Sequence, residues 1–207
     1  MSQFFHIHQD NPQHRLIVHS VEIVQAGGVI VYPTDSGYAL GCHLGDKQAV
    51  TRIRRIRRLD ERHHLTLVCS DLSQISTYAR VDNSNYRLLK AHTPGPYTFI
   101  LEATREVPRR LLHPKRKTIG LRVPDNRIAQ ALLKELQEPL MSTTLILPGE
   151  ELPLTDPYEI RQFLEHDVDL VIDGGFCGFE PTTVVDLTGD RPVVIREGSG
   201  ETESLTF

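Results

Sequence analysis

Several short segments place hydroxyls, a carboxylate or a cation where an apolar strand is predicted to end. In the first, from Tyr32 to Gly41, the residues Thr34, Asp35 and Ser36 directly follow an apolar run. Open α/β sheets bind ligands at such strand ends, and these groups can hydrogen-bond a polar ligand. A capping turn without any ligand explains the same residues equally well.

Arg122 and the hydroxyl run 142–144 extend this pattern. Arg122 lies inside the apolar run 119–123, where a buried guanidinium is costly unless an anion or a carboxylate meets it. Ser142, Thr143 and Thr144 follow an apolar pair and can hydrogen-bond either a ligand or a neighbouring strand. Both positions therefore leave a binding role and a structural role open.

Two clusters of cations stand out in a chain whose net charge is −4 at pH 7. They occupy residues 52–62 and 105–117, and we expect both to face one concavity. Such clusters can present a local positive surface to phosphates, although a solvated helix face and a basic loop would look the same. The residues predicted to form this RNA- or anion-binding surface are Arg52, Arg55, Arg62, Arg109, Arg110, Lys115, Arg116 and Lys117.

Apolar periodicity predicts the elements that would position these groups. Asp46 and Asp125 are predicted helix N-caps. The alternation of helices and apolar strands predicts one α/β domain over residues 1–207, with a twisted mixed sheet and helices packed on it. The predicted helices are 14–26, 46–58, 72–79, 83–91 and 125–136, and the predicted strands are 29–32, 65–69, 97–102, 118–123, 140–147, 168–173, 182–187 and 192–196.

The remaining composition excludes several classes of protein. Cys42, Cys69 and Cys177 are scattered without a CxxC pair, which favours buried thiols over a disulfide framework or a zinc site. No apolar run approaches the roughly 18–20 residues that a membrane span requires. We therefore expect a cytoplasmic protein that makes no membrane contact and holds no metal through its own side chains alone.

Taken in order, five motifs resemble the YrdC/YciO family of threonylcarbamoyl-AMP synthases and their relatives. The match covers about residues 27–198, which leaves 1–26 as an N-terminal extension and first helix. The resemblance implies a twisted α/β sheet with a large basic concave face that has been linked to double-stranded RNA. The motifs are Gly27–Gly41, Pro94–Thr98, Arg122–Asp125, Thr182–Asp186, and Arg196 with Gly198.

The resemblance also implies roles for individual residues. It implies that threonine, bicarbonate and ATP are the substrates, with magnesium accompanying ATP and no tightly bound cofactor; it implies no particular catalytic residue. The implied threonine-like pocket contains Thr34, Arg122, Ser142 and Thr183, and the implied nucleotide-binding residues are Arg57, Arg58, Thr144 and Arg196.

Two family elements are altered in this chain. The family's Lys-x-Arg reads Arg57-Arg58-Leu59, and its Ser-x-Asn reads Thr144-Leu145-Ile146. Losing one donor aimed at transition-state charge costs roughly a hundredfold in rate or more. Three functions follow: a weak or specialised threonylcarbamoyl-AMP synthase, a double-stranded RNA-, tRNA- or ribosome-binding protein without efficient catalysis, and a hydrolase or transferase acting on a carbamoyl-adenylate.

Overall fold

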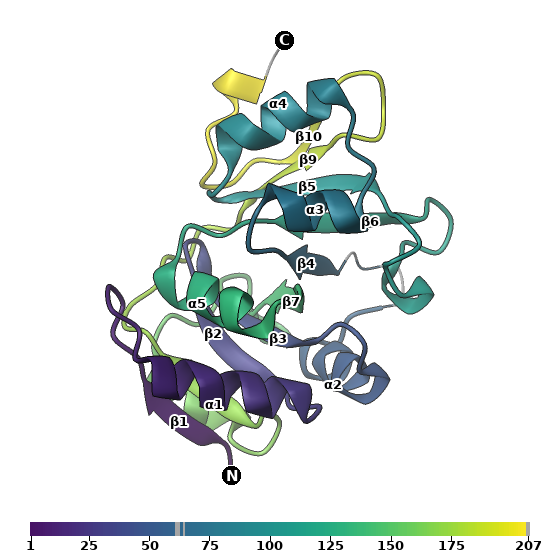
Figure 1. Ribbon diagram of the computed structural model, residues 1–207. Coiled ribbons are helices and arrows are strands. Elements are labelled where there is room, and N and C mark those ends of the chain that lie inside the picture. Colours follow the sequence, from purple (N-terminus) through teal and green to yellow (C-terminus); the bar gives the residue numbers. More distant parts are fainter. Residues whose placement is uncertain (61–62, 64, 206–207) are drawn as a thin grey trace.

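A ten-stranded mixed sheet forms the centre of the structure, which is a computed structural model that describes residues 1–60, 63 and 65–205 (Figure 1). The strand order is β1-β8-β2-β3-β7-β4-β6-β5-β9-β10. Neighbours are parallel in β1/β8, β2/β8, β4/β6 and β5/β9 and antiparallel in the other pairs. The strands are β1 (Gln3–His6), β2 (Ile30–Thr34), β3 (Gly37–His43), β4 (Thr66–Val68), β5 (Tyr97–Glu102), β6 (Thr118–Arg122), β7 (Leu140–Thr144), β8 (Leu170–Asp173), β9 (Thr183–Asp186) and β10 (Val193–Arg196).

Helices pack on both faces of this sheet and divide the core into two clusters. In β2, Ile30 and Tyr32 belong to the cluster under α1 (His14–Gln25) and α5 (Arg127–Leu136), whereas Val31 belongs to the other cluster. This split follows from the alternation of side chains along a strand. The second cluster packs against α2 (Lys47–Arg57), α3 (Leu72–Tyr78), α4 (Asn83–His92) and α6 (Pro157–Leu164). The predicted single α/β domain with a mixed sheet is confirmed.

The predicted N-cap at Asp46 is confirmed, and the one at Asp125 is wrong. The Asp46 carboxylate accepts a hydrogen bond from the Ala49 amide at 2.8 Å. For α5 the cap is Asn126, whose side-chain oxygen accepts from the Ala129 amide at 3.0 Å. The main-chain amide of Asp125 instead donates to Asp35 at 3.1 Å. The helix therefore begins one residue later, and Asp125 belongs to the segment that approaches β2.

Three elements escaped prediction: β1, β3 and α6. The glycines of β3 suggested a turn, yet β3 is a central strand between β2 and β7. Packing requires a glycine at position 41, since a Cβ there would lie 2.8 Å from the ring of Tyr32. A glycine in a strand commonly marks such a close approach. None of the helices in the described part of the chain is long and apolar enough to cross a membrane.

All three cysteines are free and buried, as predicted. Burial raises the pKa of Cys42 from 9.0 to about 12, and the charge of Asp46 adds to the shift. Between these values the unfolded thiol loses its proton while the folded one keeps it, so stability falls as the pH rises above 9. We expect this thiol alone to remove about 1 kcal/mol from the free energy of unfolding between pH 9 and pH 10.

Urea unfolding of the wild type and of Cys42→Ala at both pH values checks this expectation. The variant starts from a lower stability because its core contains a cavity, but its decrease from pH 9 to pH 10 should be smaller by about 1 kcal/mol. Parallel decreases in the two proteins would contradict the assignment to Cys42.

Candidate functional site

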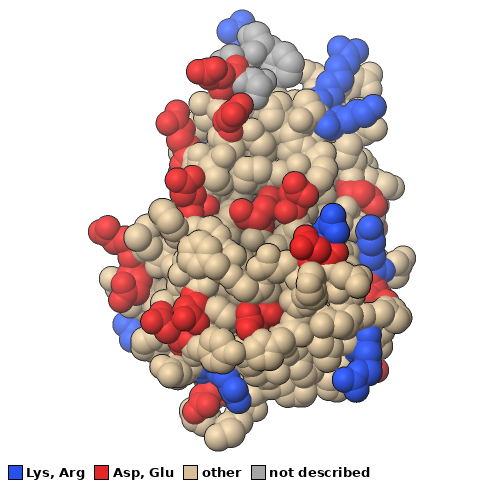
Figure 2. All heavy atoms as spheres, turned by 90° about the vertical axis from the view of Figure 1, so that its left-hand side faces the viewer, with Lys and Arg blue, Asp and Glu red and all other residues tan. Residues whose placement is uncertain are grey.

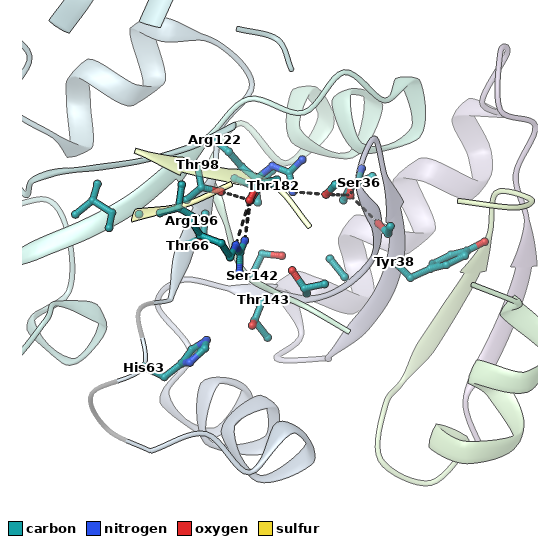
Figure 3. A pocket seen from close by; sticks show the side chains of 18 residues that line it. Ser36, Tyr38, His63, Thr66, Thr98, Arg122, Ser142, Thr143, Thr182 and Arg196 are labelled. Atoms are coloured by element: carbon teal, nitrogen blue, oxygen red, sulfur yellow. Dashed lines mark hydrogen bonds between the residues drawn. The ribbon is translucent and has the colours of Figure 1, made fainter. Parts of the chain in front are cut away.

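A row of small residues crosses the central strands on one face of the sheet. Thr66 of β4 pairs with Ser142 of β7 on one side and with Gly120 of β6 on the other, and Gly120 pairs with Ile100 of β5. Directly paired residues point to the same face, so these four lie side by side. They form the floor of a cavity of about 340 Å³ (Figure 3).

Arg122 reaches this cavity from the end of β6. Its side chain is 8% exposed and forms an ion pair with Asp35, and it donates a hydrogen bond to the Ser36 hydroxyl at 3.1 Å. Its Nε atom is buried without a hydrogen-bond partner among the described residues. Arg122 thus lines the cavity and also takes part in a buried ion pair, so the structural role that the sequence left open is confirmed and the binding role stays a prediction.

Arg196 lines the same cavity from β10. Its guanidinium donates to the Thr182 carbonyl oxygen at 2.9 Å, and the Thr182 hydroxyl lies 2.9 Å from that of Thr98. Figure 3 shows these groups beside Arg122. Burial and the charge of Arg122 lower the pKa of Arg196. Among the described residues no carboxylate forms an ion pair with Arg196, so an anion in the cavity would relieve the repulsion between the two arginines.

The hydroxyls of the floor are held in fixed orientations. Ser142 donates to the Leu40 carbonyl oxygen at 2.9 Å, so the Tyr32 hydroxyl, 2.8 Å away, must donate to Ser142. Burial raises the pKa of Tyr32 to about 12, which keeps this donor protonated. Thr34 donates to the Gly37 carbonyl oxygen at 2.6 Å. The Thr34 hydroxyl also accepts a hydrogen bond from the Ser36 amide at 3.2 Å. The Ser142 hydroxyl therefore keeps one acceptor lone pair, whereas the hydrogen bonds of Thr34 are largely satisfied within its own turn.

The cavity brings together five of the residues predicted for the substrate or nucleotide, and Thr183 is not among them. The five are Thr34, Arg122, Ser142, Thr144 and Arg196. Thr183 pairs with Tyr97, whose ring belongs to the core on the opposite face, and its hydroxyl donates to the Gly200 carbonyl oxygen at 2.6 Å. Thr182, the preceding residue, lines the cavity instead. A shift of one residue along a strand moves a side chain to the other face.

Ser36, which the sequence singled out beside Thr34, also lines the cavity, and two further hydroxyl residues in the lining, Thr66 and Thr98, were not predicted as site residues. Thr98 could have been found from its own strand. In β5, Tyr97, Phe99 and Leu101 point into the core, so the alternation places Thr98 and Ile100 on the other face. Thr66 carries no comparable signal, because β4 is only three residues long.

Arg57 and Arg58 lie at the end of α2 rather than in the described cavity lining. Arg57 is half-buried and donates a hydrogen bond to the carbonyl oxygen of Ile146, and its burial lowers the pKa of its guanidinium. Arg58 is exposed, in the left-handed conformation that ends the helix. Leu59 packs against the core. The two altered motifs, distant in sequence, thus meet just beyond Thr144.

Many of the cations predicted for an RNA surface contact groups within the protein. The relevant contacts are Arg52 with Asp169 at 2.9 Å, Arg55 with Asp167 at 3.4 Å, Arg110 with the Leu44 carbonyl oxygen at 3.0 Å, and Arg116 with Asp186 at 3.7 Å. Arg62 lies outside the described residues, and the described members of the set are absent from the cavity lining. Arg109, Lys115 and Lys117 are exposed. Figure 2 shows one face of the molecule, and acidic side chains dominate it.

Gly198 allows the chain after β10 to pass close to the cavity wall. A Cβ at this position would lie 2.6 Å from the carbonyl carbon of Thr182 and 2.7 Å from its oxygen. We expect Gly198→Ala to lower the free energy of unfolding by about 1–3 kcal/mol, because backbone atoms must move. Gly178→Ala is the matched control, since nothing lies within 4 Å of a Cβ there. Urea unfolding measures both, and equal stabilities would refute the steric argument.

The fold and the cavity together define an α/β protein with a candidate ligand site on one face of a twisted mixed sheet. The family model described as telomere recombination, which groups Sua5, YciO and YrdC, matches residues 22–198. The chain belongs to this Sua5/YciO/YrdC family.

Three relatives show how similarity is distributed within the family. The chain is 64% identical to Escherichia coli YciO over 201 residues, which is 97% of this chain and 98% of that one, and a crystal structure of E. coli YciO superposes with a TM-score of 0.96. A putative threonylcarbamoyl-AMP synthase of Methanocaldococcus jannaschii is 29% identical over 83% of this chain and 80% of its own. P. abyssi Sua5, solved with L-threonine, is 24% identical with a TM-score of 0.90, over 98% of this chain and 59% of Sua5.

Proposed function

We propose that this protein is a threonylcarbamoyl-AMP synthase of weak or specialised activity, with L-threonine bound in the described cavity. The observation that carries the proposal is the pair Arg122 and Arg196 on one cavity, where Arg196 has no carboxylate partner among the described residues. Guanidinium groups suit carboxylates and phosphates. The complex of P. abyssi Sua5 with L-threonine supports this choice of ligand.

The chemistry proposed requires positioning more than covalent help. The threonine amine attacks bicarbonate, which loses water to leave a carbamate. An oxygen of this carbamate then attacks the α-phosphorus of ATP, and pyrophosphate leaves. Arg122 would hold the threonine carboxylate and Arg196 would meet phosphate oxygens, which lowers the barrier by orientation and charge stabilisation. The described residues contain no cluster of three metal-ligating side chains, so magnesium would enter on the triphosphate.

RNA binding without efficient catalysis is the second candidate. Arg109, Lys115 and Lys117 are exposed on one segment, and this is the observation in its favour. The ion pairs of Arg52, Arg55 and Arg116 weigh against it, because each of these cations would have to exchange a carboxylate for a phosphate. Arg122 is also paired, with Asp35, but unlike them it lines the cavity and its Nε atom has no hydrogen-bond partner among the described residues. We therefore place the small-molecule site first.

Threonine-dependent pyrophosphate release from ATP in the presence of bicarbonate tests the first candidate. Release should require L-threonine and should fall at least about tenfold in Arg196→Gln, while Arg15→Gln, on the exposed surface of α1, leaves it unchanged. Calorimetry with ATP, AMP and threonine, separately and together, should show coupled binding. Salt-sensitive RNA binding without release would favour the second candidate, and hydrolysis of supplied threonylcarbamoyl-AMP without synthesis would favour a hydrolase.

A further inference from the structure

Strand β10 is an apolar edge of the sheet. Of the strands that the structure describes, it is the last in the order and pairs with β9 only. Val193 is 54% exposed, Val194 38% and Ile195 56%. An edge with free main-chain groups and three β-branched apolar side chains is a template for pairing with another strand.

The opposite edge, β1, differs in this respect. Phe4 is only partly exposed, its ring lies 5.2 Å from the ring of Tyr158, and the Arg161 guanidinium lies 5.1 Å over it. Side chains of α6 therefore cover Phe4, and His19 of α1 stacks on Phe5, the other apolar residue of β1. The exposed fractions of Val193, Val194 and Ile195 show that the described residues do not cover β10 in this way.

Both faces of β10 carry exposed apolar side chains. Val193 pairs with Asp186 and Val194 with Val185, so Val193 and Val194 point to opposite faces of the sheet. A partner resting on one face would cover only one of them. A strand lying beside β10 would contact both and would also satisfy its free main-chain groups.

We propose that β10 pairs antiparallel with β10 of a second copy of this chain, about a two-fold axis at Val194. In this register Val193 lies opposite Ile195 of the second copy, and Arg191 lies opposite Glu197, twice by symmetry. Arg191 and Glu197 are both exposed, and neither forms an ion pair within the described part of the chain. The β10 edges of two copies are thus complementary in charge.

Neighbouring registers lack this complementarity. Moving the axis to lie between Val193 and Val194 would bring Arg191 opposite Arg196, and like charges directly opposite are destabilising. The pairing of β10 with β9 shifts between Val194 and Arg196, and such a bulge twists an edge strand. The contact is therefore short, and we expect a weak dimer that forms with rising concentration.

Charge exchange at the two flanking positions tests this interface by sedimentation velocity across a wide concentration range. Arg191→Glu and Glu197→Arg should each weaken dimerisation at least about tenfold, because each creates two like-charge contacts. Mixing the two variants, or combining both changes in one chain, restores opposite charges and should restore dimerisation. Arg15→Glu on α1 makes the same change in net charge as Arg191→Glu away from β10 and should have no effect. Thermal melts check that each variant is folded.

Each result of the charge-exchange experiment either supports or contradicts the proposed pairing of β10. Loss in both single variants with recovery in the mixture and in the double variant supports the two-fold pairing at Val194. A wild type that stays monomeric at all concentrations, a dimer indifferent to both exchanges, or a failure to recover would overturn it. Dimerisation is measured by sedimentation and the proposed synthase activity by pyrophosphate release, so failure of one proposal leaves the other to be judged by its own measurement.

Discussion

Arg122→Gln should lower the affinity for L-threonine about tenfold to a hundredfold. The substitution removes a charge-assisted hydrogen bond to the ligand carboxylate, which contributes about 1.5–3 kcal/mol. Glutamine retains polar atoms and much of the length of arginine, so the loss reports mainly on the charge. Calorimetric titration with L-threonine provides the measurement.

The same change should also destabilise the fold. The sequence left open whether Arg122 has a structural role, and the structure shows that it is paired with Asp35, whose side chain is only 11% exposed. Removing one partner of a buried ion pair costs about 3–5 kcal/mol, since the other charge is left uncompensated. Urea unfolding of Arg122→Gln should show a loss of this order.

The double variant Asp35→Asn with Arg122→Gln separates binding from folding. It removes the uncompensated carboxylate, so part of the lost stability should return while threonine binding should not. If the double variant regained threonine affinity together with stability, Arg122 would act only through the structure of the cavity. Unchanged affinity in a folded Arg122→Gln protein would exclude a contact with the ligand.

Local signals predicted most of the elements but missed those that depend on distant packing. Strand β5 was predicted at its observed bounds because Tyr97, Phe99 and Leu101 alternate with smaller or polar residues. The helix cap at Asp46 followed from its side-chain chemistry. Strand β3 was missed because Gly41 is explained only by the ring of Tyr32, which no window along the sequence reveals.

The composition of the site was predicted better than its geometry. Arg122 stood out because a cation inside an apolar strand requires a partner, but Asp35 could not be assigned as that partner before β2 and β6 were placed. Thr182 and Thr183 are adjacent hydroxyl residues, and only the pairing of Thr183 with Tyr97 decides which of them faces the cavity. The role of the charge clusters stays a prediction for a related reason, since a sequence does not show which cations already have partners.

The two altered motifs allow the nucleotide site to be strengthened. Ile146→Asn restores the family amide, and Arg57→Lys with Leu59→Arg restores the family cations. Each restored contact to a bound triphosphate should raise ATP affinity or turnover about tenfold to a hundredfold. The contact between the Arg57 guanidinium and the Ile146 carbonyl oxygen places the two altered segments side by side, two residues beyond Thr144 of the cavity lining. The combined variant should therefore exceed either alone.

The packing around Leu59 and Ile146 determines which controls these variants need. Leu59 packs against the core, so an arginine there should cost roughly 1–3 kcal/mol of stability, whereas Ile146 is half-buried and should tolerate an amide better. Ile146→Asp is the matched control for Ile146→Asn, because it has nearly the same shape but no N–H donor, and its charge repels a triphosphate. Pyrophosphate release and ATP titration should rise with asparagine and fall with aspartate. If a folded triple variant gained neither ATP affinity nor threonine-dependent release, the altered motifs would not be what limits the nucleotide site, and RNA binding would become the leading function.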